Sequence, residues 1–296
     1  MLVDSPSYID LIPDQGGQDF HCLLGKLHAI TKDAVSRNLP DSSILSYSGG
    51  IDSSILNSII GELGRRKIQS ITLGVPGSQD ATALLETNTL AENDRFIRCI
   101  VDRAEVEEAA REVSRLVRVQ NVSHFEDCVC FWLIGKMASS TTKAEFVVSA
   151  NGPDELYCGY DRFRRILDAE GYPAVQNEIV RALDLADSLK REVKLVLSRF
   201  GLDSSEPLLD PTFRTFSISQ VPIEFKILKG DDKLRKRIWR ALGRNLGVPE
   251  QRVLQYKKAM QYSMGVHQII VSLLKRKIIS LDLEPSSSMQ VRDSTK

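Results

Sequence analysis

The stretch "SYSGGIDSSI", residues 46–55, follows a short apolar run and leads into a segment with helical periodicity. Two adjacent glycines, an aspartate and several serines therefore lie where a strand is predicted to end and a helix to begin. Gly49 and Gly50 allow a turn whose backbone N–H groups point inward, and the next helix presents its N-terminus. Ser48 and Ser53 add hydroxyl donors. The stretch predicts a binding turn for an anion, most simply a phosphate.

Asp52 is the unexpected member of this turn, because a bare carboxylate repels phosphates. Its presence is explained if a Mg²⁺ ion bridges the carboxylate and the phosphates. The same residues also suit a glycine turn in which Ser and Asp merely cap the helix. The stretch matches neither the G-x-x-x-x-G-K-[ST] loop nor the G-x-G-x-x-G fingerprint. The turn alone therefore leaves both interpretations open, a phosphate site with Mg²⁺ and a glycine turn that caps a helix.

The chain around the turn alternates between short apolar runs and segments with helical periodicity. This pattern predicts strands at residues 42–48, 68–75, 95–101 and 144–150, and helices at residues 53–66, 80–92, 104–117 and 124–139. Alternation of this kind predicts an α/β fold with a parallel twisted sheet and helices on both faces.

Strand signals fade after about residue 170, and the rest of the chain is predominantly helical. Further helices are predicted at residues 19–39, 174–199, 232–246 and 266–277. We therefore expect a lead-in segment (1–18), an α/β core (19–170), a helical C-terminal part that completes the site (171–284) and a flexible tail (285–296).

Composition narrows the classes of partner. The 39 basic and 39 acidic residues balance, which argues against the broad positive field of nucleic-acid and membrane-surface binders. The five cysteines are odd in number and irregularly spaced, so we expect reduced thiols rather than disulfides or a zinc site. No signal-peptide pattern or membrane-length apolar run is present, and we expect a cytoplasmic protein.

The turn "SGGIDSS" resembles the SGGxDS signature of the ATP pyrophosphatase, or PP-loop, superfamily. That superfamily includes asparagine, NAD, GMP and argininosuccinate synthetases and the tRNA lysidine synthetases. The resemblance implies an adenine nucleotide α-hydrolase-like fold, and a loop that grips the leaving pyrophosphate while an acid is adenylylated.

A second element, "SANGPDELYCGY" from Ser149 onward, resembles the SGEGADELFGGY element of asparagine synthetases and their β-lactam synthetase relatives. Asp154 follows a predicted strand at the same sheet edge as Asp52, so the two carboxylates could share a metal. The resemblance implies that both hold Mg²⁺ against the ATP phosphates. It also implies that Leu73, Ser149 and Gly152 belong to the nucleotide pocket.

Two basic segments extend the resemblance. "DKLRKRIWRAL" is similar to the K-x-x-L-R helix of the family, which implies that Lys236 and Arg240 approach phosphate. "QYKKAMQYSMG" is similar to RPKKxxQYGSG and places Lys257 where the family has a lysine that stabilises charge on the adenylate and pyrophosphate. Lys258 is the neighbour with which Lys257 could be confused.

The main departure is Asn151, which stands at the glutamate of SGEG, the family's proton acceptor in amide formation. An amide takes no proton at neutral pH, so the role is delegated or not needed. β-Lactam synthetases also lack this glutamate and have a tyrosine there. In addition, fewer than twenty residues precede the first predicted helix, and glutamine-dependent relatives carry an amidotransferase domain there. We expect free ammonia, a separate glutaminase subunit or another amine as the nitrogen source.

These observations predict an ATP- and Mg²⁺-dependent, AMP-forming amide ligase that adenylylates a small carboxylate, with aspartate the default taken from the family. One alternative is another PP-loop ligase with a different acid and amine, either β-lactam-synthetase-like or nucleotide- or tRNA-modifying. The other is a nucleotide-binding regulatory protein with impaired catalysis.

Overall fold

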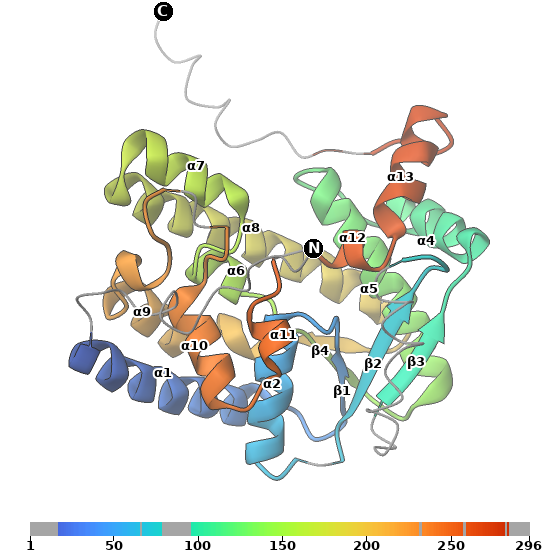
Figure 1. Ribbon diagram of the computed structural model, residues 1–296. Helices are drawn as coiled ribbons and strands as arrows, with labels where there is room; N and C mark the ends of the chain where they lie inside the picture. Colours follow the sequence, from blue (N-terminus) through green and yellow to red (C-terminus); the bar gives the residue numbers. More distant parts are fainter. Residues whose placement is uncertain are drawn as a thin grey trace, which may run out of the picture.

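The computed structural model of the chain describes residues 17–65, 67–78, 96–230, 233–256, 259–281 and 283. At its centre is a five-stranded parallel sheet with the strand order β3-β2-β1-β4-β5 (Figure 1). The strands are β1 Ser43–Ser46, β2 Gln69–Gly74, β3 Phe96–Ile100, β4 Phe146–Val148 and β5 Asp203–Ser205.

The direction in which strands are added reverses beside β1. The chain first adds β2 and β3 on one side of β1 and then returns to add β4 and β5 on the other. Ile44 of β1 is paired with Gln69 of β2 and with Val147 of β4. The carboxyl ends of β1 and β4 are therefore neighbours at the switch in strand order, where open α/β sheets bind ligands.

Helices pack on the two faces of the sheet because side chains alternate along each strand. Leu45 and Val148 belong to one hydrophobic cluster, whereas Ile44 and Val147 belong to the other. The first cluster includes residues of α1 Gly17–Asn38, α2 Ile51–Glu62, α9 Pro211–Ser219 and α10 Arg237–Asn245. The second includes residues of α4 Arg103–Leu116, α5 Val122–Thr141 and α13 Val266–Lys275. The long helix α8, Tyr172–Ser198, contributes to both.

Short elements complete the described chain: α6 Pro153–Leu156, α7 Asp161–Glu170, η3 Pro207–Leu209, η4 Ile223–Phe225, α11 Glu250–Val253 and α12 Met260–Ser263. Both hydrophobic clusters contain residues from each side of residue 170. The proposed division of the chain at that residue stays a prediction. Within the described residues, the helices include none that combines the length and apolar character needed to cross a membrane.

The predicted α/β fold, with its parallel sheet and helical C-terminal part, is confirmed. The predicted helix at 80–92 lies outside the described residues. The sequence predicts no strand near residue 204, yet β5 pairs with β4 there; its three residues, "DSS", are too few and too polar to produce an alternating signal.

The helix predicted at 232–246 begins only at Arg237. Arg235 and Lys236 have φ values of 46° and 52°, in the left-handed region that a helix does not use. The five cysteines are all free, as expected, and four of them are buried.

Candidate active site

The glycine-rich turn connects β1 to α2 and is ordered by its own hydroxyls. Gly49 has a φ of 70°, which favours glycine. The Ser48 and Ser53 hydroxyl oxygens lie 3.3 Å apart, and Ser53 Oγ donates to the carbonyl of Gly50 at 3.2 Å. Gly50 is the N-cap of α2, and no side chain among the described residues caps that end. The reading in which Ser or Asp simply caps the helix is therefore wrong, and the N–H groups of the first turn remain for a ligand.

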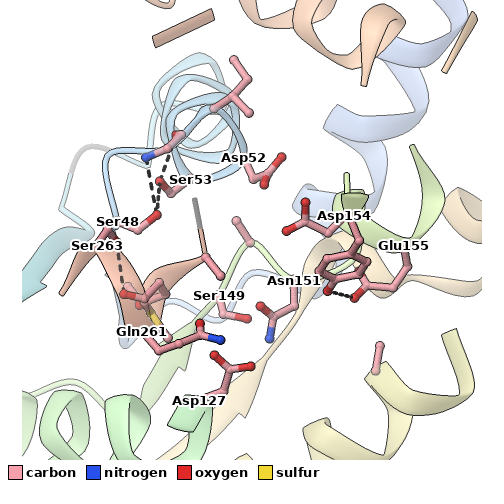
Figure 2. A pocket seen from close by; sticks show the side chains of 18 of the residues that line it. Ser48, Asp52, Ser53, Asp127, Ser149, Asn151, Asp154, Glu155, Gln261 and Ser263 are labelled. Atoms are coloured by element: carbon pink, nitrogen blue, oxygen red, sulfur yellow. Dashed lines mark hydrogen bonds between the residues drawn. The ribbon is translucent and has the colours of Figure 1, made fainter. Parts of the chain in front are cut away.

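Asp52 and Asp154 converge on a single cation. Lys236 Nζ lies 2.6 Å from Asp52 Oδ2 and 2.6 Å from Asp154 Oδ1. The lysine side chain is fully buried, whereas about one seventh of each carboxylate side chain is exposed. Figure 2 shows Asp52, from α2, and Asp154, from α6, facing one another across the pocket. The two carboxylates thus lie close together, as their places at one sheet edge predicted, and their binding of a shared metal stays a prediction.

Two glycines allow this close packing. A Cβ atom on Gly159 would lie 1.9 Å from Asp154 Oδ1 and 2.4 Å from Lys236 Cε, so any side chain there displaces the ion cluster. Gly152 has a φ of 119°, and its Cβ would lie 2.4 Å from the carbonyl oxygen of Leu208. Gly152 was expected in the nucleotide pocket, but it is not among the described residues that line the pocket, and that role stays a prediction.

A hydrogen-bonded pair, Glu155 and Tyr160, lines the pocket next to Asp154. The Tyr160 hydroxyl donates to Glu155 Oε1 at 2.6 Å. Burial, together with the neighbouring Asp154 charge, raises the pKa of Glu155. Burial and the same carboxylates raise the pKa of Tyr160 well above its usual value, so the hydroxyl stays protonated and acts as a hydrogen-bond donor at neutral pH.

The far end of the pocket has a different composition. Figure 2 shows Ser149, Asn151, Asp127 and Gln261 pointing toward one another. Ser149 Oγ is buried without a hydrogen-bond partner among the described residues, so a ligand could satisfy it. The Gln261 amide nitrogen donates to Ser123 Oγ at 2.9 Å, which ties α12 to α5. We call these four pocket residues the acceptor end; the phosphate end comprises residues 48–53 with Asp154 and Lys236.

Arg240 has a different environment from the one expected. Its side chain is fully buried, and its Nε donates to the carbonyls of Leu234 and Arg235, both at 2.9 Å. Its Nη1 donates to the carbonyls of Val253 and Gln255. Arg240 lines the pocket, but its described contacts join α10 to the residues just before it and to the end of α11. Its contact with phosphate stays a prediction.

For three other residues predicted at the site, the structure does not show a place in the pocket. Leu73, at the end of β2, is buried in the second hydrophobic cluster and is not among the described residues that line the pocket. Lys257 and Lys258 lie outside the described residues. The roles of all three stay predictions.

Three further residues at the site were missed. Trp239 Nε1 donates to Asp52 Oδ1 at 2.9 Å. Arg252 donates to the carbonyl of Gly49 and lies over the ring of Tyr47, with 5.8 Å to the centroid. Asp127 lines the acceptor end. No local pattern indicates these contacts, because the first two join residues 187 and 203 positions apart and Asp127 lies mid-helix.

The carboxylates of Asp52 and Asp154 are of the kind that binds magnesium. Mg²⁺ prefers oxygen ligands and is usually held by one or two carboxylates together with substrate phosphates and water. Two carboxylates already converge on one cation here, beside a turn with available N–H groups. The residues present therefore fit the ion that the sequence predicts.

Fold and site together define a PP-loop α/β protein whose glycine-rich turn lies at the switch in strand order. The family model "Asparagine synthase" matches residues 26–195, more than half of the chain. The chain therefore belongs to the asparagine synthase family.

Curated relatives agree with this assignment. The chain is 25% identical to asparagine synthetase [glutamine-hydrolyzing] 1 of Lotus japonicus over 253 residues, covering 81% of this chain and 42% of the relative. It is 24% identical to a putative asparagine synthetase of Methanocaldococcus jannaschii over 264 residues (77% and 47%). For asparagine synthetase B of Escherichia coli the identity is 26% over 210 residues (65% and 36%). The chain thus spans less than half the length of these relatives.

Among solved structures, the chain aligns with an NH3-dependent NAD synthetase from Campylobacter jejuni at 14% identity and a TM-score of 0.32, covering 62% of this chain and 95% of the other. It aligns with a U34-tRNA thiolase from Methanococcus maripaludis at 15% identity and a TM-score of 0.35, covering 88% and 82%.

Proposed function

We propose that this protein is an ATP-dependent, AMP-forming amide ligase that adenylylates a small carboxylate and transfers the acyl group to ammonia or another amine. The observation that carries the proposal is the convergence of Asp52 and Asp154 on one cation beside the turn of residues 48–53. An arrangement of carboxylates, a buried lysine and available backbone N–H groups suits a nucleoside triphosphate with its Mg²⁺ better than it suits an uncharged ligand.

In the first half-reaction, an oxygen of the acid attacks the α-phosphorus of ATP, and the bond to the bridging oxygen of pyrophosphate breaks. The turn and the N-terminus of α2 would hold the leaving pyrophosphate through N–H groups and the Ser48 and Ser53 hydroxyls. Asp52 and Asp154 would hold Mg²⁺, which supplies neutralisation of phosphate charge when bound. Lys236 adds a separate, buried positive charge next to the same two carboxylates.

Lys257 carries the remaining electrostatic role in this proposal. By resemblance to the family it stabilises charge that develops on the adenylate and pyrophosphate. Substitution of Lys257 by Ala should abolish turnover, and Lys258→Ala serves as the matched control. If the two variants exchange these outcomes, Lys258 is the functional lysine.

In the second half-reaction, the amine nitrogen attacks the acyl carbon, the bond to AMP breaks, and a proton leaves the nitrogen. Asn151 cannot accept that proton. We assign the role to Asp127, whose carboxylate lies at the acceptor end with Asn151. A carboxylate placed to accept a proton from the attacking group contributes typically 10²- to 10⁴-fold.

Aspartate is the default acid and ammonia the default nitrogen source, both taken from the family. Ammonia from solution or from a glutaminase would serve as the nitrogen source in this proposal. A different acid and amine pair, as in β-lactam synthetases, fits the same half-reactions.

A second candidate is a nucleotide-binding regulatory protein, and the observation that favours it is Asn151 itself, an amide where the family's acid should be. The test is to incubate the purified chain with Mg²⁺, labelled ATP and a panel of acids and amines while measuring AMP and pyrophosphate. Release that depends on one acid supports the ligase and identifies its substrate. ATP binding with no AMP or pyrophosphate under any combination contradicts the ligase and supports the regulatory protein.

A further inference from the structure

Asp52 accepts hydrogen bonds from two residues at the start of α10. Lys236 immediately precedes the helix and Trp239 lies in its first turn, and both side chains reach the same carboxylate. Lys236 Nζ lies 2.6 Å from Oδ2, and Trp239 Nε1 donates to Oδ1 at 2.9 Å. The two oxygens of Asp52 therefore have different donors, one charged and one neutral.

The indole is fixed by an aromatic stack. Trp239 is fully buried and stacks on Tyr157, with 5.2 Å between ring centroids and an interplanar angle of 12°. Phe213 meets the indole edge-on at 6.0 Å. The Tyr157 hydroxyl is bonded to Ser217 Oγ at 2.7 Å. Because none of these rings can rotate freely in such packing, the N–H direction is fixed before any ligand arrives.

Close contact between helices fixes the distance as well. A Cβ atom on Gly243 would lie 2.7 Å from Ile51 Cδ1, so this glycine allows α10 to pack directly on α2. Asp52 follows Ile51 at the start of α2. The position of the carboxylate is thus set by two helices, α2 and α10, and not by the loop alone (Figure 1).

A neutral donor has a specific advantage for a metal ligand. A carboxylate offers about four lone-pair positions, and an indole N–H uses one of them without cancelling the negative charge. The carboxylate keeps its attraction for a cation while its plane is fixed. The K-x-x-L-R pattern of the family has leucine at this position, which could pack but could not donate.

We infer that Trp239 is a positioning residue that orients the Asp52 carboxylate for Mg²⁺·ATP and whose indole reports the ligand state of that carboxylate. The inference rests on the proposed function, because it takes ATP as the ligand of the phosphate end. It makes Trp239 an internal fluorescent probe of the site, since Trp132 is the only other tryptophan in the chain.

The first experiment isolates the indole without any ligand. Trp132→Phe leaves Trp239 as the single tryptophan, and Asp52→Ala in that background removes its acceptor. The emission maximum and intensity of the indole should change between these two proteins, because the N–H loses a charged partner. Identical spectra would overturn the contact on which the inference stands.

The second experiment measures binding, not turnover. Calorimetry with Mg²⁺ and α,β-methylene-ATP should show affinity about 10-fold weaker for Trp239→Phe than for the wild type, as expected for loss of a hydrogen bond to a charged group. Tyr157→Phe is the matched control: it removes a buried hydrogen bond of the same stack but should leave the affinity unchanged. In the Trp132→Phe protein, the analogue should shift indole emission with the same midpoint as calorimetry.

These outcomes separate the two claims. If the wild type binds the analogue and Trp239→Phe binds it equally well, the positioning role is wrong while the ligase proposal stands. If the Tyr157→Phe affinity falls as far as that of Trp239→Phe, Trp239 acts through general packing and the inference fails. If the wild type does not bind the analogue, the proposed function fails first and takes the inference with it, even where the ligand-free spectra differ.

Discussion

The two ends of the pocket differ in how their charges are arranged. At the phosphate end, Asp52 and Asp154 share Lys236 at 2.6 Å, and Asp52 also accepts from Trp239. At the acceptor end, Asn151 and Gln261 are amides, Ser149 Oγ is buried without a partner among the described residues, and Asp127 is the acid in the group. In the proposed function the first end binds the nucleotide, whereas the second carries Asn151 at the position where the resemblance predicts a glutamate.

If the proposed function is correct, nucleotide chemistry and acceptor chemistry should be separable in this protein. The turn, acids and lysine of the phosphate end resemble the family's pattern, whereas Asn151 departs from it at the acceptor end. Each of the following predictions perturbs one end and asks whether the other responds.

Asp52→Ala should have the largest effect. It removes the carboxylate that α2 and α10 hold together and leaves Lys236 with one partner. We expect turnover to fall by roughly 10³-fold, the scale for loss of a major electrostatic group. Asp41→Asn, at an exposed carboxylate paired with Arg65, is the control and should retain activity. Unchanged turnover in Asp52→Ala would contradict the assignment of the phosphate end.

Asp127→Asn should impair amide formation but not adenylylation, and so distinguish the two ends of the pocket. We expect amide formation to fall by roughly 10²-fold because the proton acceptor is lost. ATP–pyrophosphate exchange, which reports adenylylation alone, should be nearly unchanged. Combining this change with Asn151→Glu should restore part of the amide formation by returning an acid to the family's position. An equal fall in exchange and amide formation would contradict the separation.

Gly159→Ala tests the packing beneath the ion cluster. The new Cβ would overlap Asp154 and Lys236, so one or both must move. We expect a loss of about 1–3 kcal/mol in the free energy of unfolding, together with weaker Mg²⁺·ATP binding. Gly61→Ala, in α2 with open space around its Cβ, should be neutral or slightly stabilising. Similar denaturation midpoints for the two variants would argue against the close packing.

Lys226→Met should have the smallest effect on activity, because Lys226 lies behind the aromatic stack, over the ring of Tyr157. Burial lowers the pKa of Lys226 from 10.5 to about 8, although its Nζ donates to the Ser217 carbonyl at 2.7 Å. Below pH 8 the lysine is charged in both the folded and unfolded states, and the folded state carries the cost of burying that charge. Between pH 8 and 10.5 the unfolded state binds more protons, so this group adds stability as pH rises.

The measurement is the free energy of unfolding of wild type minus that of Lys226→Met across this pH range. The difference should rise with pH by roughly 3 kcal/mol at most, from the size of the pKa change. Turnover should be the same in both proteins. A flat difference would mean that the buried lysine is not destabilised in the folded state.

The features that could be predicted from the sequence depend on residues that are close together along the chain. The strands and helices of the core have a local period, and Gly49, Gly50, Asp52 and Asp154 lie at element boundaries where the chain direction identifies the sheet edge. Local pattern was therefore sufficient for the α/β fold class and for the placing of Asp52 and Asp154 at one sheet edge, while their binding of Mg²⁺ stays a prediction.

What could not be predicted depends on contacts between distant residues. β5 exists because β4 offers an unpaired edge to three polar residues. The indole of Trp239 reaches Asp52 only after α10 packs on α2, and Arg252 reaches Gly49 only after α11 forms nearby. Lys236 was expected near phosphate, but its immediate partners are the two carboxylates.

The most direct test of the account is calorimetry of α,β-methylene-ATP binding, with and without Mg²⁺, to the wild type, Asp52→Asn and Asp154→Asn. If the phosphate end holds Mg²⁺ against the nucleotide, wild-type binding should strengthen markedly when Mg²⁺ is present, and each variant should lose most of that dependence. Binding that is equally tight with and without Mg²⁺, or equally Mg²⁺-dependent in all three proteins, would contradict it.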